Sequence, residues 1–143
     1  MQPAAFEVAS LADVDDEIFG PVLQIVRWGS GPLATPQAVI AQINALGSSG
    51  SAGGTAGYGL TLGIQTRIDS RAKAIAAAAH IGNVYVNRSM TGAVVGVQPF
   101  GGEGLSGTGP KAGGPHYLYR FCTEQTVTVN TTAAGGNVAL LAA

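Results

Sequence analysis

After residue 35, apolar residues recur along the chain with the period of an α-helix. They follow one another at spacings that place them on one helical face, at Val39, Ile40, Ile43 and Leu46. Thr35 is expected to cap the start of this helix, with Pro36 at its first position. Gly47 is expected to end it.

A second helix is expected over the Ala-rich residues 71–80, capped by Asp69 or Ser70. Its small side chains allow it to lie close against a sheet. The apolar runs on either side, 58–67 and 83–87, have the composition of strands. Strand, helix and strand with short joints are typical of a right-handed βαβ unit in a parallel sheet, so the predicted fold class is α/β.

Further short elements are expected near both ends of the sequence. Residues 6–8 have the pattern of the end of a strand, and the β-branched run Val22 to Trp28 predicts a buried strand. Residues 117–121 are expected to form a short helix. Residues 125–130 alternate Thr and Val and predict an edge strand, and the small apolar tail that follows is expected to dock on something, such as another subunit.

The segment 82–114 carries a glycine every few residues and lacks helical periodicity. One interpretation is a flexible Gly-rich linker. The other is an ordered loop wrapped around a ligand, which is favoured because apolar residues such as Val94, Phe100 and Leu105 are interleaved with the glycines. A second low-complexity segment, 47–57, has no residue suited to a core and predicts a mobile surface loop.

The composition narrows the classes of partner. Charged residues make up only 10% of the 143 residues, so we expect much of the surface to be covered by further chain or a partner subunit. The net charge of −1, without a basic run, gives no support for nucleic-acid binding. No apolar run is long enough to span a membrane, and no secretory signal is visible. The single cysteine, Cys122, favours a reducing, cytoplasmic location.

Several familiar catalytic and ligand-binding motifs are present only in incomplete form. Gly104-Leu105-Ser106-Gly107 lacks the final glycine of a nucleophile elbow, because Thr108 stands there. Lys111 does not follow a glycine as a phosphate-binding lysine would, and the two histidines have no cysteine or carboxylate at metal-ligand spacing. Cys122 lies at the edge of an apolar stretch and is expected to be packed and inert. The residues alone therefore assign no catalytic group and no metal site.

One combination of motifs does point to a family. It consists, in this order, of Glu17 to Val22 (EIFGPV), Tyr58 to Leu60 (YGL), Gly82 to Asn87 (GNVYVN) and Pro99 to Gly102 (PFGG) with Ser106-Gly107 beyond. This order resembles the C-terminal third of the aldehyde dehydrogenase superfamily. The runs 91–102, 113–117 and 126–137 are similar to the L-glutamate-γ-semialdehyde (1-pyrroline-5-carboxylate) dehydrogenases, including the dehydrogenase module of bifunctional proline-utilisation flavoenzymes.

The resemblance implies a fragment of the aldehyde dehydrogenase fold. Residues 1–124 are expected to form the C-terminal part of the catalytic domain, with 47–57 as an inserted loop, and 125–143 an oligomerisation strand and tail. The Rossmann half and the catalytic cysteine of the family lie upstream of the matched region. We therefore expect a chain that needs the missing N-terminal half or another subunit, and that is inactive alone.

The resemblance also implies particular site residues. Glu17 matches the glutamate that binds the nicotinamide ribose of NAD, and Phe19 matches the aromatic residue beside the nicotinamide. Gly92 and Ala93 match the positions whose backbone N–H groups hold the substrate's α-carboxylate, and Phe100 matches the wall along its methylene chain. Ser106 and Asn87 are expected to be scaffold residues. The implied activity is oxidation of the semialdehyde to glutamate; the alternative is a non-catalytic binding or assembly module derived from the same fold.

Overall fold

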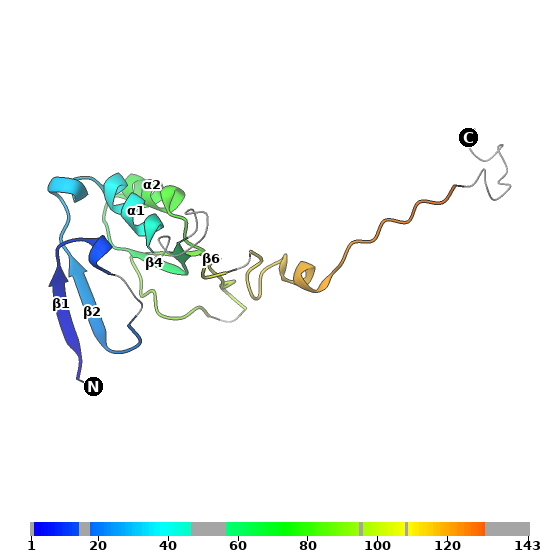
Figure 1. Cartoon of the computed structure of the whole chain (residues 1–143), viewed down its shortest axis with the longest axis horizontal. Coiled ribbons are helices and arrows are strands. Elements are labelled where there is room, and N and C mark those ends of the chain that lie inside the picture. The colour runs from blue at the N-terminus through cyan, green and yellow to red at the C-terminus, as the bar shows by residue number, and fades with distance from the viewer. Residues whose placement is uncertain (1, 15–17, 47–56, 95, 108, 131–143) are drawn as a thin grey trace.

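The computed structural model describes residues 2–14, 18–46, 57–94, 96–107 and 109–130. The elements in chain order are β1 (Ala4–Val8), η1 (Leu11–Asp13), β2 (Val22–Val26), η2 (Gly31–Leu33), α1 (Pro36–Ala45), β3 (Tyr58–Gly59), β4 (Thr61–Ile64), α2 (Asp69–Ala78), β5 (Asn83–Val86), β6 (Glu103–Gly104) and η4 (Tyr117–Phe121). Strands pair in twos: β1 with β2 and β4 with β5 in parallel, and β3 with β6 in antiparallel. Figure 1 shows α1 and α2 side by side on one side of β4.

The predicted βαβ unit is present as β4, α2 and β5. The register places Leu62 opposite Val84 and Ile64 opposite Val86, so the two strands run in parallel over their whole length. The predicted strand 58–67 is interrupted, however, because its first part leaves β4 at Leu60 and pairs instead with β6 as β3. The two parts of this run therefore belong to two different sheets.

The first predicted helix is confirmed, together with its start. The Thr35 hydroxyl accepts a hydrogen bond from the Ala38 amide at 3.2 Å, and Pro36 is the first helical residue. Asn44, near the end of α1, ties this helix to α2. Its side chain donates to the Ala78 carbonyl and accepts from the His80 amide, each at 2.9 Å. Gly47, the expected end of the helix, lies outside the described residues.

The predicted cap of the second helix is wrong. Ile68 occupies the N-cap position of α2 and makes no side-chain cap, while Asp69 is already the first helical residue. The Asp69 carboxylate pairs with Lys73 one turn later at 2.7 Å instead of turning back to the helix amides. The acidic group still lies at the positive end of the helix, where it is stabilising.

A small set of side chains forms the core beneath the two helices. Its buried apolar members come from α1, α2, the βαβ strands and the joints between them: Leu33, Ile40, Ile64, Ala72, Ile81 and Tyr85. Many large apolar side chains outside this set are exposed, among them Phe6, Leu23 and Trp28. This distribution agrees with the low charge of the sequence, since a surface that carries so much apolar area is typical of one that is covered in the assembled protein.

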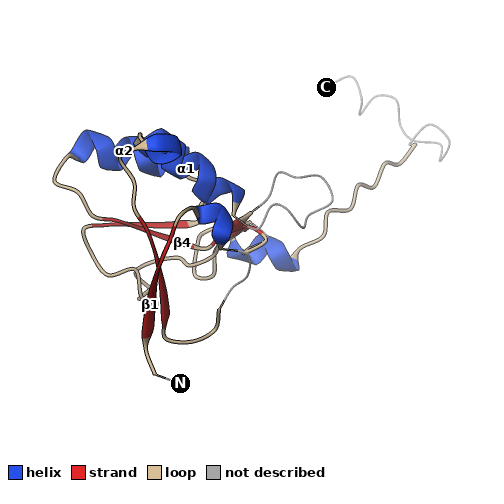
Figure 2. Cartoon of the chain, turned by 60° about the vertical axis from the view of Figure 1, so that its left-hand side comes forward, coloured by secondary structure: helices blue, strands red, loops and turns tan. Residues whose placement is uncertain are grey.

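The run 22–28 forms a strand, β2, but the prediction that it is buried is wrong. Leu23 is 59% exposed and Trp28, beyond the end of the strand, is 53% exposed. Within the described part of the chain, β2 pairs only with β1, and large apolar side chains of both strands are exposed, among them Phe6, Leu23 and Ile25. Figure 2 shows β1 turned away from the helices. Parallel strands are normally covered on both faces, and here that cover is not part of the described residues.

The expected edge strand at 125–130 is not formed either. No strand is assigned to these residues, and Val127 and Val129 are 74% and 69% exposed. Figure 1 shows this segment extending away from the body of the molecule beyond η4. An edge strand needs a neighbouring strand for its ladder of hydrogen bonds, and no described element lies beside it. The short helix predicted at 117–121 is present as the 3₁₀-helix η4.

None of the described helices is long and apolar enough to cross a membrane. The predicted mobile loop at 47–57 lies almost wholly outside the described residues. Its two flanks are joined, because the Tyr58 amide donates to the Leu46 carbonyl at 2.9 Å.

Candidate functional site

The candidate site begins where β5 ends. Asn87 has a left-handed backbone, with φ of 55°, which turns the chain out of the sheet. Its side-chain amide accepts from the Thr66 amide and donates to the Thr66 carbonyl, each at 2.9 Å. The prediction that Asn87 is a scaffold residue is confirmed, although it braces the ends of β4 and β5 rather than the Gly-rich loop itself.

Gly92 and Ala93, the expected carboxylate anchor, lie in the loop that follows. Gly92 has φ of +67°, and a Cβ placed on it would meet nothing within 4 Å. Neither backbone amide donates to another described residue. Two adjacent backbone amides without a described acceptor can bind an anion, and the carboxylate anchor at Gly92 and Ala93 stays a prediction.

A tight turn separates this anchor from Phe100. The amides of Val97 and Gln98 both donate to the Val94 carbonyl, at 3.1 and 3.0 Å, and the Gln98 side chain accepts from the Val94 amide at 3.3 Å. The turn therefore brings the chain back on itself after Ala93. Gly92, Ala93 and Phe100 consequently belong to one local loop.

Phe100 is held by a two-way backbone bridge. Its amide donates to the Ala112 carbonyl at 3.0 Å, and the Ala112 amide donates to the Phe100 carbonyl at 2.9 Å. The ring is half-buried and lines a hollow of about 250 Å³ together with Tyr117 and Arg120. Phe100 is therefore fixed at its backbone while part of its ring remains available to a ligand.

Close backbone packing explains why the segment between Phe100 and Ala112 is so rich in glycine. A Cβ on Gly102 would lie 2.4 Å from the Ser106 carbonyl oxygen, and one on Gly107 would lie 2.0 Å from the Gly102 carbonyl oxygen. The Ser106 hydroxyl accepts from the Gly59 amide at 3.1 Å, which joins the loop to β3 and confirms the scaffold prediction for this serine. The segment is therefore an ordered loop and not a flexible linker.

Of the two residues expected to contact the cofactor, only Phe19 is among the described residues. Phe19 lies just before β2 and is 88% exposed, so no described residue covers its ring. Glu17 lies outside the described residues. Gly92, Ala93 and Phe100 thus share the segment between β5 and β6, although neither Gly92 nor Ala93 lines the hollow beside Phe100. Phe19 lies in the connection between β1 and β2.

Sequence reasoning missed Lys111. Its ammonium group donates a hydrogen bond of 2.6 Å to the carbonyl of Gly101, the residue that follows Phe100. A signal was present, because Lys111 is the only lysine or arginine between Arg88 and Arg120. Lys111 does not fit a phosphate-binding motif, and for that reason no role was predicted for it. The informative feature is that it is a single positive charge within a Gly-rich segment.

The expectation that Cys122 is packed is wrong. The thiol is exposed and donates weakly to the Leu118 carbonyl, with 3.4 Å between sulfur and oxygen. The cause is the position of η4, which lies beyond the Gly-rich loop and away from the helices and strands (Figure 1). The neighbouring side chains of Leu118 and Phe121 are likewise exposed, at 72% and 74%.

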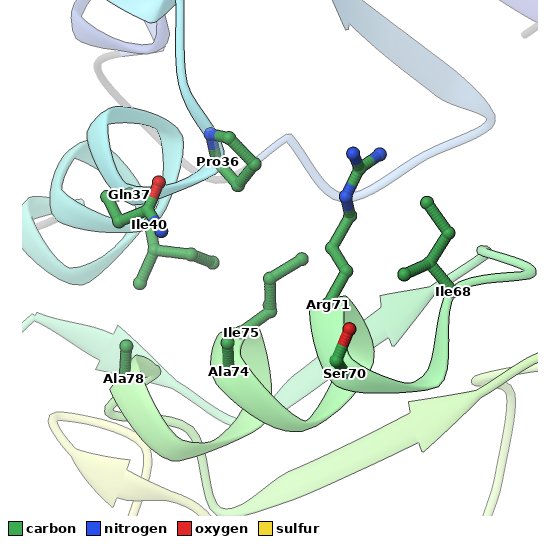
Figure 3. A pocket seen from close by; sticks show the side chains of 9 residues that line it. All are labelled: Pro36, Gln37, Ile40, Ile68, Ser70, Arg71, Ala74, Ile75 and Ala78. Carbon is green, nitrogen blue, oxygen red and sulfur yellow. The ribbon is translucent and has the colours of Figure 1, made fainter.

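A second hollow, of about 360 Å³, lies between α1 and α2. Figure 3 shows Ile40 of α1 and Ile75 of α2 lining it, with the Arg71 side chain between Ile75 and Ile68. None of the residues expected to bind substrate or cofactor belongs to it. The loop after β5 therefore remains the candidate site.

Comparison with known proteins agrees with these features. Residues 2–127 match the Aldehyde dehydrogenase family. The chain is 56% identical over 123 residues to the Bifunctional protein PutA of Escherichia coli (strain K12), covering 86% of this chain and 8% of that protein. It is 36% identical over 135 residues to the 1-pyrroline-5-carboxylate dehydrogenase of Geobacillus thermodenitrificans, covering 90% of this chain and 22% of that protein.

A solved structure shows the same arrangement of the backbone. The structure of proline utilization A (PutA) with proline bound in remote sites matches with a TM-score of 0.70 and 53% identity, over 90% of this chain and 12% of that one. The chain therefore spans about a tenth of the length of the PutA proteins that it matches.

Proposed function

Because the chain belongs to the aldehyde dehydrogenase family and has part of that fold, we propose that it is part of an NAD-dependent dehydrogenase that oxidises L-glutamate γ-semialdehyde to glutamate in proline catabolism. The similarity to PutA and to 1-pyrroline-5-carboxylate dehydrogenase supports this reaction. In this proposal the chain contributes binding groups to the site, within a larger cytoplasmic enzyme.

The observation that carries the proposal is the pair of accessible amides at Gly92 and Ala93. The semialdehyde differs from simple aldehydes in bearing an α-carboxylate, which requires hydrogen-bond donors. The open space beside Gly92 leaves room for such a group to approach the backbone. Charge-assisted hydrogen bonds from the two amides to the carboxylate bind the substrate and also orient it.

Phe100 serves as the apolar wall of the same site. Its backbone is fixed by the bridge to Ala112, and its ring is half-buried. A flat, partly exposed ring packs against the methylene groups between the carboxylate and the aldehyde. The anchor and the wall together place the aldehyde carbon at a set distance from Gly92, and such positioning lowers the barrier to reaction.

NAD is the cofactor that we assign. The exposed ring of Phe19 fits this assignment, because an uncovered aromatic side chain is suited to contact a planar heterocycle. Glu17, two residues earlier, is assigned to the ribose hydroxyls. When bound, the cofactor accepts a hydride from the substrate.

The catalytic cysteine is assigned to a part of the enzyme outside this sequence. Cys122 is exposed and follows η4 as its C-cap residue, after the loop that carries the anchor and the wall, and it is not assigned a catalytic role. The isolated chain is accordingly expected to show no dehydrogenase activity. Production of reduced cofactor by the isolated chain, abolished by C122S, would contradict this assignment.

A chimera tests the proposal directly. The homologous segment of Escherichia coli PutA is replaced by this chain, and reduction of NAD is followed with L-glutamate γ-semialdehyde and with propionaldehyde. We expect turnover of the semialdehyde, with a clear preference for it over propionaldehyde. A chimera that folds and binds NAD but oxidises neither aldehyde would refute the proposed function.

One observation favours an assembly role for the end of the chain. Val127 and Val129 are exposed in an extended segment, a feature typical of a strand that pairs with another polypeptide. We assign residues 125–143 to subunit assembly. A non-catalytic assembly module would bind the remainder of PutA without supporting turnover, so the chimera also separates these two functions.

A further inference from the structure

We propose that Lys111 is a positioning residue of the substrate site, whose ammonium group holds the Gly101 carbonyl and thereby fixes Phe100. This inference rests on the proposed function, because it assigns Phe100 as the wall of that site. Lys111 itself touches neither the substrate nor the cofactor in this proposal.

The Gly101 carbonyl receives two side-chain hydrogen bonds, from residues that are far apart in the sequence. Lys111 Nζ donates to it at 2.6 Å, and Asn83 Nδ2 donates to it at 3.0 Å. Asn83 is 7% exposed, and its amide also donates to the Leu60 carbonyl at 2.8 Å. The carbonyl is thus attached both to the start of β5 and to the returning strand of the loop.

The rest of the lysine side chain packs along the same peptide. A Cβ placed on Gly101 would lie 3.4 Å from Lys111 Cα and 3.5 Å from its Cγ, which is ordinary contact. A Cβ placed on Gly82 would lie 2.8 Å from Lys111 Nζ and 2.1 Å from the Gly101 oxygen. The ammonium therefore occupies space that exists only because residue 82 is glycine.

This clamp lies directly beside the bridge that fixes Phe100. Gly101 follows Phe100, and Lys111 precedes Ala112. The ammonium contact therefore joins the two ends of the same loop that the Phe100–Ala112 bridge joins. Removing the ammonium leaves a half-buried carbonyl with one donor fewer and frees the peptide after Phe100 to rotate. A rotated peptide displaces the aromatic wall, which weakens substrate binding more than it slows the chemical step.

Amide hydrogen exchange on the isolated chain tests the clamp. K111M keeps the length of the side chain and removes the ammonium, and K73M removes an exposed lysine of α2 as the matched control. We expect exchange of the Phe100 and Ala112 amides to accelerate about tenfold or more in K111M alone. The Asn87 amide, bonded to the Ile64 carbonyl at 2.8 Å, reports on whether β4 and β5 stay intact. Unchanged exchange at Phe100 and Ala112 would overturn the proposal.

Chemical rescue distinguishes the ammonium group from general packing. In a C122S background, K111C is alkylated with 2-bromoethylamine, which restores a side chain of similar length that ends in an ammonium. Protection of Phe100 and Ala112 should fall in K111C and return after alkylation. Failure of the alkylated chain to regain protection would show that the charge is not what holds the loop.

Kinetics of the PutA chimera test the positioning role. K111M should raise KM for the semialdehyde about tenfold while kcat changes less than about threefold, and K73M should leave both unchanged. A fall in kcat without a change in KM, or no change in either, would overturn the role. A wild-type chimera that folds and binds NAD but is inactive would refute the proposed function and the positioning role with it, whereas the exchange experiment would still decide whether Lys111 holds the loop.

Discussion

At the scale of single residues, Gly92 is the position whose substitution best separates the two classes of aldehyde. In the PutA chimera, G92V should weaken binding of the semialdehyde by about 1.5–3 kcal/mol, or roughly ten- to a hundredfold, because a branched side chain occupies the place of the carboxylate. Propionaldehyde makes no carboxylate contact, so its turnover should fall much less. Steady-state KM values for both aldehydes provide the measurement.

Gly113 supplies a matched control for strain. It also has a left-handed backbone, with φ of +73°, and a Cβ on it would likewise meet nothing within 4 Å. G113V therefore imposes a similar backbone penalty away from the proposed anchor. If G92V and G113V reduced binding of the semialdehyde equally, backbone strain would explain the loss and the anchor would lie elsewhere.

The ion pair of Glu7 and Arg27 makes stability depend on pH in the acidic range. Arg27 Nε lies 2.7 Å from a Glu7 carboxylate oxygen, and the side-chain hydrogen bond and the charge of Arg27 lower the pKa of Glu7 below its usual 4.5. A carboxyl whose pKa is lowered by folding stabilises the protein above its unfolded pKa, and this contribution is lost as the pH falls through the folded pKa. Both groups are largely exposed, so the effect should be small and sensitive to salt.

R27Q should return the pKa of Glu7 to its ordinary value. NMR titration of the Glu7 side chain measures this shift, and R67Q removes an arginine outside the pair as a control. The wild-type chain should lose more stability than R27Q when the pH falls from neutral to below 4. An identical Glu7 pKa in the two proteins would mean that the pair does not form in solution.

At the scale of elements, the low-complexity segment after α1 should be dispensable. The Leu46 carbonyl and the Tyr58 amide are already bonded to each other, so the two flanks of the segment meet without it. Deletion of residues 48–56 should change the free energy of unfolding by less than about 1 kcal/mol, because loop-closure entropy varies slowly with length. Urea unfolding followed by circular dichroism gives the comparison; a cooperative loss of folding would show that these residues pack against the domain.

Elements whose partners lie nearby in the sequence were predictable. Helix α1 was visible from its apolar period and from Thr35, because the capping bond depends only on residues within one turn. The βαβ unit was visible for a similar reason, since β4 and β5 are separated by a single short helix. Ser106 was correctly expected to brace the Gly-rich loop, whereas Asn87 braces the ends of β4 and β5 instead.

Elements that depend on distant or external partners were not predictable. The run 58–67 was expected as one strand, but pairing with β6 more than forty residues later divides it. Residues 125–130 have the composition of an edge strand and lack the neighbour that such a strand requires. Lys111 was missed for a related reason, because its partner, the Gly101 carbonyl, is a backbone atom that no side-chain motif records.

At the scale of the whole molecule, apolar surface is distributed unevenly. The helices and the βαβ unit enclose the core, whereas the β1–β2 ribbon exposes Phe6 and Leu23 at 56% and 59%. A parallel pair of strands with such faces is characteristic of the interior of a larger sheet. We therefore infer that the remainder of the enzyme covers this ribbon.

Substitution of Leu23 tests whether the ribbon is covered, by comparing the loss of stability in the isolated chain with that in the PutA chimera. In the isolated chain, L23A removes a side chain that is mostly exposed and should cost less than about 1 kcal/mol of unfolding free energy. In the PutA chimera the same side chain is expected to be buried, and the cost should rise to about 2–5 kcal/mol. I40A provides the control, because Ile40 is only 5% exposed in the chain itself and its loss should cost about 2–5 kcal/mol in both contexts. Urea unfolding of the four variants and of their two unsubstituted parents measures these costs. An equal, small effect of L23A in both contexts would show that the ribbon stays open in the assembled enzyme.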